Sequence, residues 1–509
     1  MQVSPPPTLE QAIEQIHALS VENKILREQI QVLRMGLFGR RSERIDPGQL
    51  ALFEVGERPE VKEEAGPAPA PAGKRSKGHG RARFPDSLPR ETIEVDVPED
   101  ERSCPDCGKA MRPFGEDTCE RGHIVPARIV VRRYVKKKYS CPDGHAVKTA
   151  PTPEGVIDKA KYEASVYAHV ATSKYADHLP LHRLEGIFKR HGMRLSKQTM
   201  WDMLVKVDEL VAEPVLKQMR EELLAEGVLH SDETPVTMRI EDGKGTRTSY
   251  AWAWRNLRWV GDSKVLVEFR PNRSRDGPLR FLRDWSGTLI SDAYSGFDEV
   301  VRENGIVRAG CMAHARRKVK EALETGSKAA VRLLRPIQRL FWIERAVQRR
   351  AERRGIDHAE MLELRGRVRD RRSRPVLGRL YDQAVVLGEE RSTLPKSKLG
   401  KALRYLDRQR EALSVFLADP RIPIHNNDTE RDLRHVAVGR KNWLVFASHR
   451  GGEVACRLYS LVLSCKQSGI DPEAYIEDLL RKVGTTPASK IATLTPWGWK
   501  AARGDIAQG

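Results

Sequence analysis

Two short apolar runs that both end in Ser-Asp constrain the fold of this 509-residue chain most strongly. "VLHSD" ends at Asp232 and "LISD" ends at Asp292, and both runs have the composition of buried β-strands. If the two strands are neighbours, their carboxylates meet at one edge of a sheet. Two carboxylates about 4 Å apart repel by roughly 4 kcal/mol at an effective dielectric constant near 20. Such a pair needs a divalent cation or a proton, whereas a single Asp more simply caps the following turn.

The stretch "HNNDTERDLR" offers a third carboxylate further along the chain. With Asn427 as the N-cap of a helix, Glu430 falls at the third helical position. A Glu there is able to reach back to the cap as a capping-box acid, or to pair with Arg434 one turn on. Both alternatives would leave Glu430 with a purely structural role.

Helical spacing separates Glu430 from its acidic neighbours. Glu430 shares a stripe with Leu433, the side expected to face the sheet, while Asp428 and Asp432 stand together on another stripe and are expected to face solvent. Glu430 is therefore the acid predicted to face Asp232 and Asp292.

The chain is too long for one hydrophobic core, so several domains are expected. Runs typical of β-strands begin near residue 226, and an almost wholly helical segment interrupts them. We expect an α+β or α/β core in two parts, at residues 223–315 and 421–485. A helical insertion at residues 316–420 would separate the two parts, and a tail at residues 486–509 would follow.

The net charge of +19 is concentrated in the expected insertion. Residues 315–379 contain 20 Lys or Arg and 8 Asp or Glu, which indicates a polyanion-binding surface or, alternatively, a solvated Arg-rich face. No apolar run approaches the roughly 20 residues needed to span a bilayer, and the N-terminus lacks the features of a signal peptide. We expect no membrane contact and a cytoplasmic, nucleoid-associated location.

A heptad repeat near the N-terminus predicts a coiled coil within residues 1–45. The repeat places Asn23 at an a position, where its twin in a parallel, in-register homodimer satisfies it. The alternative is an amphipathic helix that packs on its own chain. Residues 46–90 are rich in Pro, Ala, Gly, Lys and Glu and are expected to form a flexible basic linker. The repeat consists of Leu9, Ala12, Ile16, Leu19, Asn23, Leu26, Ile30, Leu33 and Leu37.

Residues 91–150 alternate apolar and polar positions and contain a CxxC knuckle, which predicts a small zinc-ribbon-like β module that binds DNA. A second pair of ligands is needed to complete a tetrahedral structural Zn²⁺ site. The candidate ligands are Cys104, Cys107, Cys141 and His145, with Cys119 and His123 as a rival second pair.

Residues 151–222 are expected to be helical and similar to a helix-turn-helix. The second helix of this motif would follow a turn at Gly192 and begin at the cap Ser196. Lys197 and Gln198 stand at its start, where a recognition helix meets base edges. The alternative is a helical hairpin that packs on a neighbour.

Several motifs occur in a fixed order: "LFGRRSER", "HSDETPV", "ISDAYSGF", "GCMAHARRK", "HNNDTERDLR", "VGRKNWLVFAS" and "LTPWGW". Together they resemble the insertion sequence 66 family of bacterial transposases, although His425 stands where that family usually has Asp. The resemblance implies a multidomain DDE transposase with a ribonuclease-H-like catalytic domain, an α+β or α/β fold. A large helical insertion would interrupt this domain, and the coiled coil, zinc module and helix-turn-helix-like region would precede it.

The resemblance also implies the chemistry. Asp232, Asp292 and Glu430 would hold two Mg²⁺ or Mn²⁺ ions, cut DNA at the terminal inverted repeats of the element, and join the freed 3′-OH to target DNA. Cys311 and His314, spaced C-x2-H, would orient the site or, alternatively, would be a buried Cys and a helix-capping His. The cap Asn427 would also orient the site. Accessory proteins of the same element are implied as partners. The expected phosphate contacts are Arg316, Arg317, Lys318, Arg440 and Lys441, while Trp443 would stack on a base or belong to the core.

The sequence is also compatible with two other functional classes. A dimeric, non-catalytic DNA-binding regulator would account for the charge, the zinc module and the heptads. A structure-selective nuclease on the same fold would cleave DNA without joining it to a second duplex.

Overall fold

The structure is a computed structural model that describes residues 9–38, 129–140, 147–149, 160–240, 245–258 and 261–504. Residues 41–130 form one compact unit, and residues 1–40 together with 131–509 form the other. All six candidate zinc ligands and the expected linker lie outside the described residues. None of the described helices has the length and apolar character to cross a membrane.

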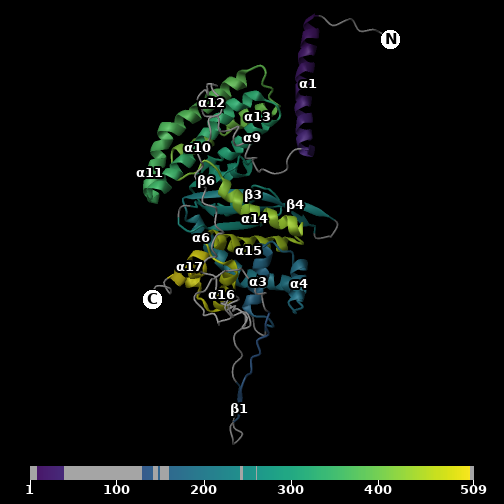
Figure 1. Ribbon diagram of the computed structural model, residues 1–509, viewed down its shortest axis with the longest axis vertical. Coiled ribbons are helices and arrows are strands. Elements are labelled where there is room, and N and C mark those ends of the chain that lie inside the picture. Colours follow the sequence, from purple (N-terminus) through teal and green to yellow (C-terminus); the bar gives the residue numbers. More distant parts are fainter. Residues whose placement is uncertain are drawn as a thin grey trace, which may run out of the picture. The chain divides into compact units, whose positions relative to one another are not determined.

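A mixed five-stranded sheet forms the centre of the larger unit (Figure 1). Its strand order is β5-β4-β3-β6-β7. Strands β3, β4 and β5 pair antiparallel, whereas β3 pairs parallel with β6 and β6 parallel with β7. The five strands are β3 (Val228–Arg239), β4 (Thr246–Asn256), β5 (Val265–Arg270), β6 (Thr288–Ser291) and β7 (Val307–Gly310).

Both faces of the sheet are covered, as the sequence of β4 requires. Trp252 and Trp254 alternate with small residues and point to one face, where Trp254 stacks on Phe281 of α7 (Asp276–Phe281) with ring centres 4.1 Å apart. Arg255 points to the other face and pairs with Asp432 of α14 (Asn427–Trp443). Helix α14 contacts β3 and β4 (Figure 1), so this helix is held directly over the strand that carries Asp232.

Helix α15 (His449–Gln467) covers the edge strand β5. Its Ser460 and Ser464 hydroxyls accept hydrogen bonds from the backbone N–H groups of Val267 and Val265, at 2.7 and 3.1 Å. These serines satisfy backbone donors that an open sheet edge would leave unpaired.

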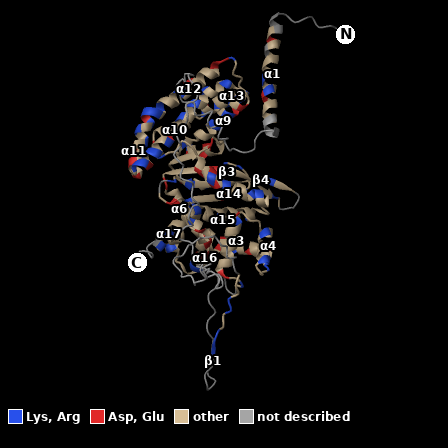
Figure 2. Cartoon of the chain, viewed as in Figure 1, with Lys and Arg blue, Asp and Glu red and all other residues tan. Residues whose placement is uncertain are grey.

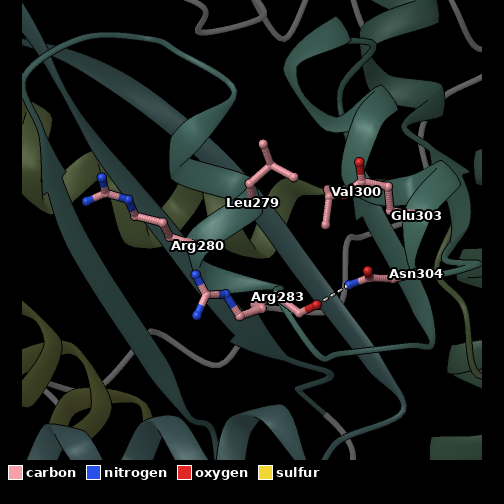
Figure 3. A pocket seen from close by; sticks show the side chains of 6 residues that line it. All are labelled: Leu279, Arg280, Arg283, Val300, Glu303 and Asn304. Atoms are coloured by element: carbon pink, nitrogen blue, oxygen red, sulfur yellow. Dashed lines mark hydrogen bonds between the residues drawn. The ribbon is translucent and has the colours of Figure 1, made fainter.

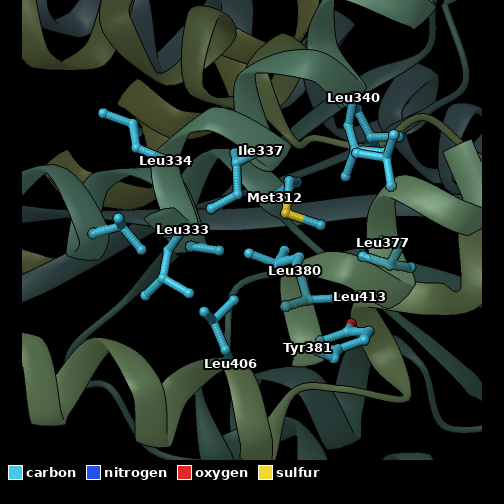
Figure 4. Packing of buried hydrophobic residues seen from close by; sticks show 14 of the residues in the cluster. Met312, Leu333, Leu334, Ile337, Leu340, Leu377, Leu380, Tyr381, Leu406 and Leu413 are labelled. Carbon is cyan, nitrogen blue, oxygen red and sulfur yellow. The ribbon is translucent and has the colours of Figure 1, made fainter. Parts of the chain in front are cut away.

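Every described element between β7 and α14 is helical. These helices share one hydrophobic core with the sheet, since Met312, Leu333 and Leu380 pack in the same cluster as Ile290 of β6 (Figure 4). The insertion is thus packed against the sheet, although its expected bounds of 316 and 420 remain a prediction. The main helices are α9 (Met312–Glu324), α10 (Val331–Arg354), α11 (His358–Val368), α12 (Arg374–Glu389) and α13 (Lys398–Arg408).

The region before the sheet contains the expected pair of short helices. Gly192, with φ +84°, makes the turn between α4 (Leu181–Arg190) and α5 (Lys197–Val207). Ser196 caps α5, as predicted, because its hydroxyl accepts from the Thr199 N–H at 3.1 Å. The other elements are β1 (Lys138–Ser140), β2 (Val147–Thr149), α3 (Ala164–Tyr175), α6 (Glu213–Leu224), α8 (Asp298–Glu303), α16 (Pro472–Lys482) and α17 (Pro496–Gly504).

The predicted heptad segment is one continuous helix, α1 (Leu9–Phe38). Large apolar side chains of the repeat are exposed on it, including Ile16 at 67% and Leu33 at 65%. Such a stripe is what one strand of a coiled coil presents, and the homodimer remains a prediction.

Candidate active site

Asp232, on β3, and Asp292, which directly follows β6, lie at equivalent positions relative to these neighbouring parallel strands. His230 of β3 pairs with Ile290 of β6, and each Asp comes two residues after its strand's residue in that pair. Strand β3 continues past Asp232 to Arg239 and forms a hairpin with β4. What ends near Asp232 is the pairing with β6, which leaves both carboxylates at the same edge.

The register with β4 sets the direction of Asp232. Asp232 is directly opposite Ala253, so its side chain points to the face that α14 covers, the same face as Arg255. Burial first, and then the negative charges of Glu233, Asp292 and Glu430 in that order, raise the pKa of Asp232 to about 8. All three predicted acids therefore belong to one electrostatic group.

Glu430 lies in the first turn of α14 and reaches toward α9. Its carboxylate oxygens are 3.6 Å from His314 Nε2 and 3.5 Å from Arg317 Nη2. Oε1 forms no hydrogen bond with any described residue, and no capping-box bond returns to the N-cap, whose N–H donates to Cys311 Sγ instead. The structure thus places the charge of Glu430 where it acts on Asp232. It also leaves Glu430 Oε1 without a hydrogen bond to a described residue.

A fourth carboxylate, Glu233, was missed by the sequence reasoning. It is directly opposite Trp252, on the other face of β3 from Asp232. Burial and then the charge of Asp292 raise its pKa to about 7, while Arg273 opposes the shift. Adjacent residues of a strand point to opposite faces, which is why the sequence offered no reason to select Glu233.

Arg273, in the loop between β5 and α7, contacts both Glu233 and Asp292. Its guanidinium forms an ion pair with Glu233 and lies 3.7 Å from Asp292 Oδ2. The same group lies 4.1 Å from the ring centre of Tyr294, whose N–H donates to Asp292 Oδ1 at 2.9 Å. Arg273 was also missed, because it meets these acids only through the fold. It supplies positive charge at the acidic edge.

A buried asparagine fixes the start of α14. Helix α14 begins at Asn427, so its N-cap is Asn426 and the predicted cap Asn427 is wrong by one residue. The Asn426 side chain donates to the Ser231 carbonyl oxygen at 2.8 Å and accepts from Thr429 Oγ1 at 2.9 Å. Its backbone N–H donates to Cys311 Sγ at 3.2 Å. Asn426 therefore joins β3, the start of α9 and the helix that carries Glu430.

His230 completes this buried network beside Asp232. Burial lowers the pKa of His230 to about 4, so its ring is neutral at pH 7. Its Nδ1 lies 2.8 Å from Asn426 Oδ1, and because an amide oxygen only accepts, Nδ1 carries the proton.

The prediction that Asp428 and Asp432 face solvent is wrong, since both are buried. Asp432 accepts from Arg255 Nη1 at 2.8 Å and from Gln467 Nε2 at 2.9 Å. Asp428 pairs with Arg431 Nη1 at 3.2 Å. Their stripe packs against the sheet because β4 places the cation Arg255 there, which a pattern based only on hydrophobicity does not reveal.

Most of the predicted DNA contacts lie at the surface. Lys197, Gln198 and Lys441 are exposed, although Gln198 Nε2 already donates to Asp202 at 2.8 Å. The Lys318 Nζ lies 5.1 Å from the centre of the Tyr405 ring, in a cation–π contact. Burial first, and then the charge of Arg345, lowers the pKa of Arg316.

Arg440 and Trp443, on the last turn of α14, contact protein. Arg440 donates to Thr234 Oγ1 at 3.0 Å. Trp443 packs edge-on against Tyr175, and Lys174 lies 4.3 Å from its ring centre. This packing favours the core alternative for Trp443 over a stack on a DNA base.

The carboxylates do not form a ready-made metal site as they stand. Among the described residues, no three His, Cys, Asp or Glu side chains converge closely enough to hold an ion. Arg273 and Arg317 lie among the acids instead. The set still suits a hard cation such as Mg²⁺, since all donors are carboxylate oxygens. Two of these oxygens, Glu430 Oε1 and Glu233 Oε2, are buried without a hydrogen bond to a described residue.

Two pockets of the described structure lie away from these acids. One of about 230 Å³ lies between α7 and α8, and in Figure 3 its side chains include Arg280, Arg283 and Asn304. Asn304 Nδ2 donates to the Arg283 carbonyl oxygen at 2.9 Å there. A second pocket, of about 410 Å³, lies on α10.

Four family descriptions match successive parts of the chain. "Transposase IS66 family" matches residues 159–454, which include all three acids. The chain therefore belongs to the IS66 transposase family. The others are "Transposase C of IS166 homeodomain" at residues 25–93, "zinc-finger binding domain of transposase IS66" at 101–143 and "IS66 C-terminal element" at 460–497.

Individual relatives cover nearly the whole length. The uncharacterized protein y4jD of Sinorhizobium fredii is 30% identical over 97% of this chain and 97% of its own length. The uncharacterized protein y4qI of the same organism is 31% identical over 92% of this chain and 88% of its own. The similarity thus extends from the N-terminal region to the C-terminal element.

Proposed function

We propose that this chain is a DDE-type DNA transposase that binds the terminal inverted repeats of its insertion sequence, cleaves DNA and transfers the 3′-OH end. Asp232, Asp292 and Glu430 are the proposed catalytic acids. The observation that carries the proposal is that the charges of Asp292, which directly follows β6, and of Glu430, in the first turn of α14, both raise the pKa of Asp232 on β3. The sheet order, three antiparallel strands followed by two parallel ones, supports a ribonuclease-H-like catalytic domain.

The donor set fits divalent cations, and Asp232, Asp292 and Glu430 would hold them. Bound Mg²⁺ or Mn²⁺ would lower the pKa of the attacking water or 3′-OH and stabilise the leaving 3′-oxygen. The raised pKa of Asp232 fits this role, because a buried acid among other acids is charged most readily when positive charge is added beside it.

The surrounding residues orient the acids and neutralise charge. Asn426 holds the first turn of α14 against β3, so the backbone of Glu430 is fixed relative to Asp232. His314 and Arg317 flank the Glu430 carboxylate, and Arg273 stands beside Asp292. We infer that Arg273 and Arg317 contact DNA phosphates, since guanidinium groups recognise phosphate oxygens in a two-pronged geometry.

Other parts of the chain would bind DNA and assemble the protein. We propose a structural Zn²⁺ held by Cys104, Cys107, Cys141 and His145, a homodimer formed through α1, and DNA contacts from α5. The match to a zinc-finger domain at residues 101–143 supports the first of these.

The test is a nicking assay on a labelled duplex that ends in the element's repeat, with Mg²⁺. Asp232→Asn, Asp292→Asn and Glu430→Gln should each abolish nicking and leave DNA binding in EDTA intact. Glu303→Gln, which changes an exposed acid on α8, is the matched control and should nick normally. Nicking by all three variants would disprove the site, and cleavage without joining of a 3′-OH end would indicate a nuclease.

A further inference from the structure

Helix α10 presents an unusually basic face on the side opposite its core. The helix contains eight Arg and two Glu in 24 residues. Leu333, Ile337 and Val347 are among the residues that bury one side of it. The other side is a stripe with three- or four-residue spacing, formed by Arg335, Arg339, Trp342, Ala346, Arg349 and Arg353.

The two acids of α10 do not neutralise this stripe. Glu344 points inward and forms ion pairs with Arg369 and Arg365 at 2.8 and 3.0 Å. Glu352 accepts from Gln348 Nε2 at 3.1 Å. The four arginines at the end of the helix are exposed, and none forms an ion pair with any described residue. They are Arg349, Arg350, Arg353 and Arg354.

An exposed tryptophan lies among these arginines. Trp342 is 41% exposed, and the Arg339 guanidinium lies 4.2 Å from its ring centre. The small side chain of Ala346 helps to leave a pocket of about 410 Å³, lined by Trp342, Ala346 and the same four arginines. Basic residues gather over α10 and α11 in Figure 2. A solvated Arg-rich helix accounts for the charge but not for an indole exposed within it.

This surface adjoins the candidate active site. Phe341, next to Trp342, stacks on His425 with ring centres 5.9 Å apart and planes 10° apart. His425 directly precedes Asn426, the N-cap of the helix that carries Glu430. A DNA strand that leaves the acidic edge would therefore find α10 beside its path.

We propose that Trp342 and the arginines from Arg349 to Arg354 form a binding site for single-stranded DNA. The indole would stack on an unpaired base and the guanidinium groups would bind phosphates, a combination that suits single strands of any sequence. The stretch from Trp342 to Arg353 spans about 17 Å at 1.5 Å per residue. The inference rests on the proposed function, because it assigns this site to DNA unpaired near the cleavage point.

Photo-crosslinking of the full-length protein in EDTA locates the site directly. The probe is an oligo-dT 20-mer with 5-iodo-deoxyuridine at its centre, followed by peptide mapping. The expected crosslink is on Trp342, and Trp342→Ala should lose it and bind the 20-mer roughly 5- to 150-fold more weakly. Trp342→Phe should retain most of the affinity. Crosslinks that map only to other elements would overturn the proposal.

The charge contribution is tested by salt dependence. Arg349→Glu with Arg353→Glu should weaken binding and reduce the slope of log K against log salt by about 1.4, since each phosphate contact to a single strand contributes about 0.7. Arg302→Glu with Lys490→Glu makes the same charge change at exposed positions of other elements and should leave the slope nearly unchanged. Equal effects of the two double variants would mean that only net charge matters and would overturn the site.

The two proposals fail separately. A protein that nicks its duplex but gives no Trp342 crosslink refutes only the α10 site. A protein that crosslinks at Trp342 but does not nick refutes only the catalytic proposal.

Discussion

Two acid–arginine pairs on helix α14 differ sharply in burial although they are only two residues apart. Asp432 and Arg255 have side chains 0% and 1% exposed, with a contact of 2.8 Å. Glu430 and Arg317 are 30% and 49% exposed and lie 3.5 Å apart. Asp432 has a second donor in Gln467, whereas Glu430 Oε1 has no hydrogen bond to a described residue.

The difference separates an acid that holds the fold from one that is available for chemistry. A buried ion pair with its hydrogen bonds satisfied is costly to break, because the remaining charge is stranded away from water. An exposed, loose pair contributes little to stability, and its carboxylate is able to exchange partners. The first pair fastens α14 to β4, and the second lies beside Asp232 and Asp292.

The largest effect should follow from Glu430→Gln. We expect nicking to fall about 1000-fold or more, because loss of a metal-holding carboxylate removes several kcal/mol of transition-state stabilisation. The thermal unfolding midpoint should stay close to that of the unmodified protein, since no capping bond is lost. Nicking rates and calorimetry on the same preparation check this, and a large fall in the unfolding midpoint would instead give Glu430 a structural role.

Asp432→Ala should do the opposite. We expect the free energy of unfolding to fall by about 3–5 kcal/mol, because Arg255 is left buried without its partner. Urea titration measures this, and whatever protein remains folded should bind DNA normally. Asp432→Asn, which keeps the side chain's shape and one acceptor, should cost less. A fully stable Asp432→Ala protein would remove the contrast between the two pairs.

Sequence alone predicted the elements that carry the proposed acids better than the surroundings of these acids. The strands that carry Asp232 and Asp292 and the helix that carries Glu430 were predicted because local composition and spacing record them. Arg273 and Asn426 could not be selected, since their partners are far away along the chain and meet them only in the folded sheet. Asp432 was placed wrongly for the same reason: its burial depends on Arg255, 177 residues earlier.

The one-residue error at the start of α14 has a similar cause. The sequence "HNND" offers two asparagines as caps, and the periodicity of Leu433 fits either register. The choice between them is made by hydrogen bonds from Asn426 to Ser231 and Cys311. Propensity alone contains no information about such distant groups.

The raised pKa of Asp232 predicts that the stability of the protein depends on pH. The Asp232 carboxyl has lost its proton by about pH 5 when unfolded but keeps it to about pH 8 when folded. The protonated Asp232 carboxyl therefore contributes fully to stability below about pH 4, and this contribution is lost as the pH rises to about 8. Glu233, with its pKa raised to about 7, acts in the same direction.

In the Asp232→Asn variant, the amide at position 232 does not titrate between pH 5 and pH 8. The urea midpoint of this variant should therefore fall less over that range than that of the unmodified protein. The measurement is made without divalent cations, and added Mg²⁺ should reduce the difference by favouring the charged carboxylate. Parallel pH profiles for the two proteins would show that the Asp232 carboxyl titrates alike in the folded and unfolded states.

The smallest effect on stability should come from Arg317→Ala, the exposed partner of Glu430. We expect the free energy of unfolding to change by less than about 1 kcal/mol, because an exposed ion pair is weakened by water and by salt. Nicking should nevertheless fall and its salt dependence become shallower, since the guanidinium is proposed to bind a phosphate. Lys320→Ala is the matched control, because it removes another exposed cation of α9 that pairs with Glu324. If the two variants nick equally well, Arg317 serves only to pair with Glu430. Arg273 would then be the remaining candidate for a phosphate contact beside the acids.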